Sequence, residues 1–316
     1  MPEFPSAQAL PAAGVAARRF WSIVFLTASL GLVLAWGGPR MLERAPHVPE
    51  RLPAPLQDWL QRLQAEPDWS EVPVGPLLGK ARRRGELVVG IRQYARPAPP
   101  GAPAPAEPDN FDAALARFLA ERLNVRVRLV GLGPDAAPQA VDLIIAGTRQ
   151  AGSGVPAVPT PYTGGDGVLV VLRGSASRHA SDLRQRTVCV AQGSPYAADL
   201  SQRMAAQLKV YGSAIRAVSG FMAGECQALA EDGVVIARLL SLPEWRFYRQ
   251  LDTTLRPDNN SPQIALRMND AVSAAWLDRA VRQWKLSGAL AQARERRAGD
   301  VAFEASQLQD GLVCHS

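Results

Sequence analysis

The chain has 316 residues, of which 47% are hydrophobic and 20% are charged. This length leaves room for two domains, the hydrophobic content is sufficient for a packed core, and the composition excludes a globally disordered chain. The formal net charge is +6, but the arginines are scattered along the chain rather than gathered on one face among aromatic residues. We therefore interpret the charge as a solvated basic surface and not as a nucleic-acid-binding patch.

The N-terminal region contains an apolar segment, residues 20–36, that has no charged residue and follows Arg18 and Arg19. Such a segment is typical of a cleaved signal peptide or of a short membrane anchor, and the sequence leaves both open for residues 1–38. Positive residues precede the segment and most of the chain follows it, so we expect the remainder to be exported. A Pro-rich stretch, residues 39–79, predicts a spacer between the membrane and the folded part.

The first folded region is predicted to be an α/β unit. Residues 87–91 form a short apolar run that indicates a buried strand, and residues 111–123 place apolar side chains at helical spacing. Residues 125–130 alternate apolar and basic side chains like a half-buried strand, and residues 141–146 indicate another buried strand. Strand, helix, strand and strand in this order predict an α/β unit with a right-handed crossover.

These segments contain short sequence motifs that occur in a recognisable order between Gly85 and Val171. GELVVG opens the first strand, FDAALA lies in the helix, VDLIIAG forms the later strand, and PY precedes a further strand. This order resembles that of family 3 extracellular solute-binding proteins, the periplasmic receptors of polar amino-acid importers, over roughly residues 80–290. The resemblance implies an α/β, two-lobe, periplasmic-binding-protein-like (type II) fold with a ligand cleft between the lobes, preceded by the N-terminal hydrophobic helix. The Pro/Ala-rich tract at residues 97–108 departs from the family, whose loop there is short.

The resemblance also divides the chain into lobes. Two crossovers, near residues 174 and 257, assign residues 80–173 and 257–316 to lobe 1 and residues 174–256 to lobe 2. The later predicted elements are, in chain order, a strand at residues 187–191, a helix at 196–208, a helix-like run at 226–231, an apolar run at 234–240, a returning strand at 261–268 and a helix at 271–286.

The chain has three cysteines. Some amino-acid-binding relatives carry a cysteine at each of the places occupied by Cys189 and Cys226, so the resemblance implies a disulfide between them. The alternative is two buried free thiols, which behave as small hydrophobic groups. An exported protein favours the bridge, and Cys314 is then left over.

The sequence contains no motif that indicates catalysis, metal binding or a cofactor. Its three histidines have no ligand spacing, and H-E-x-x-H, C-x-x-C and G-x-S-x-G are all missing. We therefore expect a binding protein and not an enzyme. A few relatives of the fold, the cyclohexadienyl dehydratases, eliminate water from small acids, and Asp166 is the candidate proton donor under that less favoured interpretation.

The candidate ligand contacts come from the resemblance and lie on loops and strand ends. They are Arg149, Thr163, Gly165, Asp166, Gly193, Ser194 and Arg238. The Gly193-Ser194 pair is expected to start a helix, where free backbone N–H groups bind a carboxylate, or to be an ordinary N-cap. Arg149 matches the family arginine that clamps the ligand carboxylate by two hydrogen bonds, although its spacing from the preceding strand is shorter than in the family.

The segment that follows the second-lobe strand departs further from the family. Relatives place an acid there to hold the ligand's ammonium group, whereas we align that position with Ala237 or Arg238. Asp166, within the Thr163–Asp166 loop, is left as the acid that pairs with an ammonium or forms a turn. Two arginines against one acid predict a preference for an anionic solute.

The leading functional hypothesis is therefore an exported solute-binding protein that captures a small polar or anionic solute, an amino acid or an organic acid, by closing two lobes, and delivers it to an ABC importer. Its partners are the small-molecule ligand and the importer's permease. The alternative is a non-transport binding module with a degenerate pocket, a sensor or assembly accessory tethered to the inner membrane by an uncleaved N-terminal helix. Both place the folded part in the periplasm or outside the cell, with no cofactor and no nucleic acid.

Overall fold

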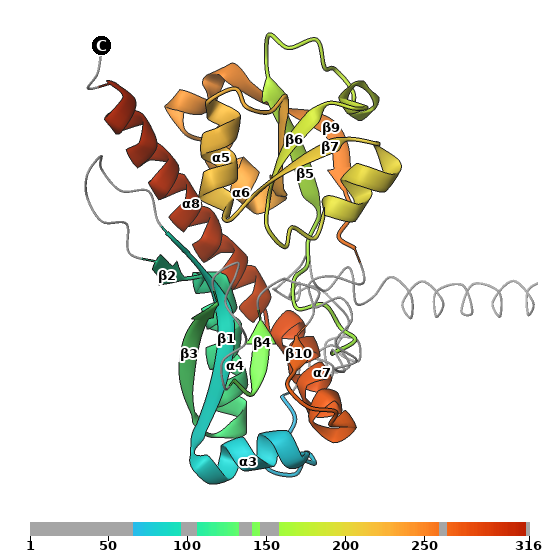
Figure 1. Ribbon diagram of the computed structural model, residues 1–316, viewed down its shortest axis with the longest axis vertical. Helices are drawn as coiled ribbons and strands as arrows, with labels where there is room; N and C mark the ends of the chain where they lie inside the picture. The colour runs from blue at the N-terminus through green and yellow to red at the C-terminus, as the bar shows by residue number, and fades with distance from the viewer. Residues whose placement is uncertain (1–65, 96–105, 133–140, 146–157, 259–263, 314–316) are drawn as a thin grey trace, which may run out of the picture. The chain divides into compact units, whose positions relative to one another are not determined.

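The computed structural model describes residues 66–95, 106–132, 141–145, 158–258 and 264–313. All of them belong to one compact unit, Val48–Ser316, which contains two β-sheets (Figure 1). No helix in these ranges combines the length and the apolar character that crossing a bilayer requires. The apolar segment at residues 20–36 lies outside them, as do Arg149 and Cys314.

The first sheet is built around β1 (Glu86–Ala95). It pairs in parallel with β3 (Arg126–Leu132) and β4 (Leu143–Ile145), and antiparallel with β2 (Ala106–Pro108). The short strand β10 (Ala265–Leu266) closes the other edge next to β4. A right-handed crossover through a helix is the connection that parallel neighbours such as β1 and β3 require.

The helices of the first lobe are α3 (Pro76–Arg84), α4 (Asn110–Leu123) and α7 (Ala271–Leu286). Local chemistry fixes the ends of α4: the Asp109 side chain accepts hydrogen bonds from the backbone N–H groups of Phe111 and Asp112, at 3.0 and 3.1 Å, and Asn124 ends the helix in the left-handed conformation. Aromatic rings fill the space between α4 and α7, with Phe118 edge-on to Trp284 at 5.1 Å.

The second sheet has the strand order β7-β6-β8-β5-β9. Its strands are β5 (Gly167–Leu172), β6 (Thr187–Ala191), β7 (Gln207–Tyr211), β8 (Ala228–Asp232) and β9 (Tyr248–Leu255). The helices α5 (Ala214–Met222) and α6 (Gly233–Leu240) pack on one face, and the short helical turns Ala180–Leu183 and Asp199–Arg203 contribute to the core of the other face. A third turn, Pro243–Phe247, supplies the buried Trp245.

The predicted disulfide is present. Cys189 of β6 and Cys226, just before β8, form a bridge with their Cα atoms 5.7 Å apart, and both side chains are buried. This separation is within the range that an unstrained bridge allows.

One helix contributes to the cores of both lobes. The last helix, α8 (Ala289–Val313), places Leu290 and Ala293 in the hydrophobic core of the first lobe. Further along, Ala298, Val301 and Ala302 lie in a core of the second lobe. The helix therefore joins the two lobes along its length (Figure 1).

The observed lobes differ from the predicted bounds in three places. Trp69, predicted to lie in the spacer, packs against Trp276 of the first lobe in a tilted ring contact with centroids 5.1 Å apart. Strand β5, predicted to belong to lobe 1, pairs with β8 and β9 in the second sheet. Helix α8, also assigned to lobe 1, reaches into the second core. Sequence order alone does not reveal these contacts, because each depends on which sheet edge or helix face is free after the rest has folded.

Two predicted elements have a different secondary structure. The helix expected at residues 196–208 is only a short turn around Asp199–Arg203, followed by β7. The run at residues 226–231, expected to be helical, forms most of β8, and the apolar run that follows is helix α6. The runs at residues 226–231 and 234–240 are short and mostly apolar. Hydrophobic periodicity does not distinguish a buried strand from a buried helix in runs of that length.

Candidate functional site

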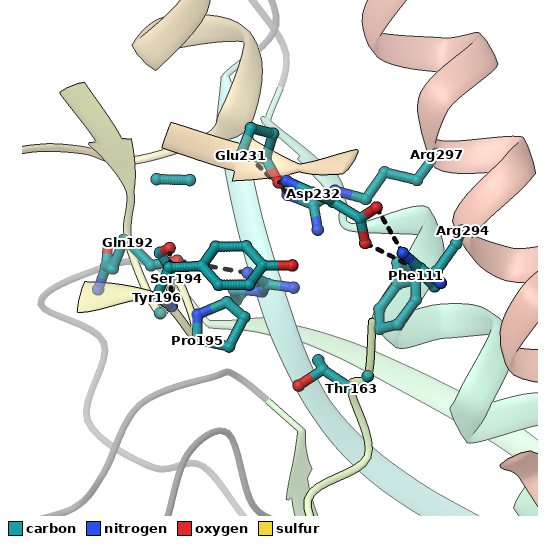
Figure 2. Close-up of a pocket in the computed structure, with 14 residues that line it drawn as sticks. Phe111, Thr163, Gln192, Ser194, Pro195, Tyr196, Glu231, Asp232, Arg294 and Arg297 are labelled. Carbon is teal, nitrogen blue, oxygen red and sulfur yellow. Dashed lines mark hydrogen bonds and ion pairs between the residues drawn. The ribbon is translucent and has the colours of Figure 1, made fainter. Parts of the chain in front are cut away.

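A small pocket lies where the first sheet, the second sheet and α8 come together (Figure 2). β1 supplies Arg92, the end of β8 supplies Glu231 and Asp232, and α8 supplies Arg294 and Arg297. The remaining lining is mostly loop, from Thr163-Gly164 and the segment Gln192–Tyr196. The carboxyl ends of strands in α/β sheets are the usual place for ligand sites, and this pocket is at the carboxyl end of β8.

The first half of the charged network surrounds Arg92. Its guanidinium donates to both carboxylate oxygens of Asp112, from Nε at 2.7 Å and from Nη2 at 2.9 Å, and lies 3.5 Å from Asp109. The Tyr162 hydroxyl donates to the same Asp112 carboxylate at 3.3 Å. Arg92 also donates to the backbone carbonyl of Gln192 at 3.4 Å, which joins the first lobe to the second.

Burial and charge act in opposite directions on the two acids beside Arg92. Burial raises the pKa of Asp112 to about 6, despite the nearby guanidinium. Burial also raises the pKa of Asp109, but Arg92, Arg297 and the N-cap hydrogen bonds outweigh it, so the pKa is lowered overall. Asp109 is therefore ionised over a wider pH range than Asp112, although the two share one arginine.

The second half of the network pairs α8 with the end of β8. Arg294 donates to both oxygens of Asp232, from Nε at 2.7 Å and from Nη2 at 2.8 Å (Figure 2). Arg297 donates to the two oxygens of Glu231 at 3.1 and 3.2 Å. The Asp232 carboxylate also caps α6 by accepting from the N–H of Val234 at 2.8 Å.

These pairs are shielded from solvent. The side chains of Asp232 and Glu231 are 9% and 6% exposed, and those of Arg294 and Arg297 are 18% and 19% exposed. Burial lowers the pKa of Arg294, but the hydrogen bonds and charge of Asp232 outweigh it, so the pKa is raised and the guanidinium stays charged.

The charged network contains more acids than bases, although the lining of the pocket itself includes three arginines and two acids. Among the described residues that build the network there are three guanidinium groups and four carboxylates: Arg92, Arg294, Arg297, Asp109, Asp112, Glu231 and Asp232. The free space between them is small, about 20 Å³ in the pocket of Figure 2 and about 30 Å³ in a neighbouring one beside Tyr94 and Asp300. Each space has room for about one water molecule.

Several candidate ligand residues lie at or beside this pocket. Thr163, Gly193 and Ser194 line it, and the buried hydroxyl of Thr163 has no hydrogen-bond partner among the described residues. Gly165 and Asp166 lie next to it: the Gly165 carbonyl accepts from the Tyr196 hydroxyl at 3.3 Å, and the charge of Asp166 contributes to the raised pKa of Arg294.

Of the two arginine candidates, only Arg238 can be placed relative to the described pocket. Arg149 lies outside the described residues. Arg238 lies in the last turn of α6 with an exposed side chain, and it is not among the residues that line the pocket. The Gly193-Ser194 pair lies in a turn after β6 and does not start a long helix, since only the short helical turn Asp199–Arg203 follows. The expected helix N-terminus is therefore missing there.

Ala237 and Arg238, aligned with the family's acid position, lie within helix α6 and do not directly follow a strand. The alignment rested on a strand that includes residues 234–236, but β8 ends at Asp232 and those residues are helical. The acids that follow the second-lobe strand are thus Glu231 and Asp232. The signal was available in the sequence, because the run ALAED ends an apolar segment on two acids immediately before a glycine.

Sequence analysis also missed the bases of the network. Arg294 and Arg297 are three residues apart and so share one face of α8, but nothing local shows that this face meets β8. Arg92 lies in β1, and only the apolar residues of that strand, 87–91, indicated it in the sequence.

No family model matches this sequence, and no curated protein matches it. Solved structures do resemble it. An amino acid ABC transporter substrate-binding protein from Streptococcus pneumoniae, bound to L-arginine, is 16% identical with a TM-score of 0.52, covering 71% of this chain and 98% of that one. A second such protein from the same organism, AbpA, also bound to L-arginine, is 20% identical with a TM-score of 0.50 over the same shares of the two chains. The fold is that of the amino-acid substrate-binding proteins.

This result confirms the predicted two-lobe α/β fold, and it confirms the resemblance to solute-binding proteins at the level of the fold. Identities of 16% and 20% do not carry over a ligand.

Proposed function

We propose that this chain is an exported solute-binding protein that captures a small polar solute with a cationic group, and delivers it to an ABC importer. The observation that supports this most directly is the convergence of charged side chains from both lobes and α8 on one pocket at the carboxyl end of β8. In this proposal the lobes separate to admit the solute and close on it by a hinge motion.

The two carboxylates that end β8 support a cationic rather than an anionic solute. The expected anionic preference rested on Arg149 and Arg238, and Arg238 lies elsewhere with its side chain exposed. The network instead contains four carboxylates and three guanidinium groups among its described members. Because unpaired charge is costly in a desolvated site, a solute that reaches Glu231 or Asp232 must supply the positive charge that Arg297 or Arg294 supplies there. An ammonium or guanidinium group does so, and a carboxylate does not.

The site offers a solute two kinds of contact. Glu231 and Asp232 end β8 with carboxylates that accept charge-assisted hydrogen bonds. The buried hydroxyl of Thr163, across the pocket from Asp232 (Figure 2), has no hydrogen-bond partner among the described residues and can bond a polar group of the solute. The permease partner and the periplasmic location follow from the exported topology that the N-terminal segment predicts, and both are parts of the proposal.

The proposal is tested by thermal shift with the purified protein against lysine, arginine, alkylguanidines, dicarboxylates and neutral amino acids. A solute at 100 times its dissociation constant should add about 2.7 kcal/mol of stability. The Asp232→Asn variant should lose the effect, whereas Asp199→Asn, at an exposed ion pair of the same geometry, should keep it. Stabilisation by dicarboxylates alone would contradict the proposed charge preference.

The second candidate is the tethered non-transport binding module with a degenerate pocket. It is favoured by the small free space, because the chain's own arginines occupy most of the junction. Two measurements distinguish the two candidate functions. The mature N-terminal residue shows whether the apolar segment is retained, and a screen in which no solute stabilises the protein supports the module.

A further inference from the structure

The pocket already contains a cation in the position where a solute's cationic group would bind. Arg294 of α8 forms two parallel hydrogen bonds to Asp232, at 2.7 and 2.8 Å. This fork-to-carboxylate arrangement is the geometry by which a protein binds a guanidinium ligand. Arg297, one turn further along α8, donates from Nη2 alone to both oxygens of Glu231, at 3.1 and 3.2 Å. Both acids that end β8 are therefore occupied by groups from the chain itself.

A second observation is that the loop before β5 leaves space for the Arg294 guanidinium. Gly165 has φ of +91° in the loop before β5, and a Cβ atom at this position would overlap the Arg294 guanidinium. Only glycine combines this backbone conformation with the space that the guanidinium occupies. The loop and α8 are thus matched to each other, although they are about 130 residues apart in sequence.

The occupied state leaves no room for a solute. The cavity next to the Arg294–Asp232 pair has a volume of about 20 Å³, whereas pockets for small molecules are typically about 300 Å³ or larger. A solute cation can reach Asp232 only if Arg294 withdraws. Since Arg294 lies between the part of α8 that packs on the first core and the part that packs on the second, its withdrawal is coupled to the position of that helix.

We propose that Arg294, assisted by Arg297, is a built-in guanidinium ligand that holds the lobes closed without solute and that a solute must displace. The inference deepens the proposed function, because it names the cation subsite and the group that competes for it. The consequence is ligand specificity. A solute must form the two parallel hydrogen bonds to Asp232 that Arg294 forms, and this requirement favours guanidinium groups over simple ammonium groups. The apparent affinity is reduced by the fraction of molecules in which Arg294 occupies the subsite.

The test is chemical rescue with methylguanidinium, used at millimolar concentration well below denaturing levels. The purified Arg294→Ala protein should melt at a lower temperature than the wild type, and methylguanidinium should raise its melting temperature. By calorimetry the variant should bind methylguanidinium at least tenfold more tightly than the wild type. The matched control is Arg203→Ala, which removes an exposed guanidinium with two hydrogen bonds to Asp199, at 2.7 and 2.6 Å. That control should show no rescue, and equal rescue of both variants would overturn the inference.

A second variant covers the possibility that Arg294→Ala does not fold. Arg294→Lys keeps the positive charge but forms no two-pronged contact, so methylguanidinium should bind it more tightly than it binds the wild type. Equal binding to the wild type and the lysine variant would overturn the inference.

The outcomes also separate this inference from the proposed function. If methylguanidinium rescues Arg294→Ala while no solute stabilises the wild type, the built-in ligand is supported and the solute-capture function fails. If a solute binds the wild type and Arg294→Ala with equal affinity, the function stands and the built-in ligand is refuted.

Discussion

Arg92 should be one of the most sensitive positions in the protein. Its side chain is 16% exposed and pairs with Asp112, which is fully buried, through two hydrogen bonds of 2.7 and 2.9 Å. The Arg92→Leu variant removes the cation and leaves two carboxylates, Asp109 and Asp112, close together in a buried site. Breaking a buried pair on one side typically costs about 3–5 kcal/mol. This is a large part of the ~5–15 kcal/mol by which domains are stable.

The measurement is urea denaturation of the purified protein. With a slope of about 3 kcal/mol per molar urea, the midpoint should fall by about 1–1.7 M. The matched control is Arg128→Leu, since Arg128 pairs with Glu86 at 3.0 Å but is 54% exposed. An exposed pair contributes about 0–1 kcal/mol, so the control should shift the midpoint by less than about 0.3 M.

A double variant tests the reason for the effect. Arg92→Leu combined with Asp112→Leu removes both charges and fills the space with apolar atoms, and such replacements are often close to neutral. The double variant should therefore be more stable than Arg92→Leu alone. The reasoning is refuted if Arg92→Leu is no more destabilising than Arg128→Leu, or if the double variant shows the summed loss of the two single variants.

Three further predictions concern stability. Asp112 has a pKa raised to about 6 from 3.8, so the stability it contributes is fully present below pH 4 and is lost as the pH rises through 6. Relative to the wild type, Asp112→Asn should then gain about 2.4 kcal/mol between pH 4 and 7 in denaturation experiments. The Cys189–Cys226 bridge closes a loop of 37 residues, and replacing both cysteines by alanine should cost about 3–4 kcal/mol. Asp270 caps α7 and accepts from the Ser273 N–H at 3.0 Å and from its hydroxyl at 2.6 Å, so Asp270→Ala should cost about 2 kcal/mol.

Each of these predictions has an outcome that would contradict it. A constant difference between Asp112→Asn and the wild type across the pH range would show that Asp112 does not titrate near pH 6. An unchanged thermal midpoint after removal of both cysteines would show that the bridge does not restrain the unfolded chain. Asp270→Ala should be compared with Asp252→Ala, an exposed position on β9, and equal effects would rule out a capping role.

The sequence by itself determined the local features of this protein. The apolar run after Gly85, the amphipathic segment behind Asp109 and the run at residues 187–191 form β1, α4 and β6, because burial pattern and capping act over a few residues. The pairing of Cys189 with Cys226 was predicted through the resemblance and is confirmed. The two-lobe fold was also predicted through the resemblance and is confirmed.

The tertiary structure alone decided the functional site. Arg92, Asp232 and Arg294 are separated by 140 and 62 residues in the chain, and they meet only because two sheets and the last helix converge at one junction. From its own segment alone, each of these three side chains would be interpreted as an ordinary surface residue. Their pairing depends on which acid remains buried at the end of β8 and which face of α8 covers it, and long-range packing fixes both.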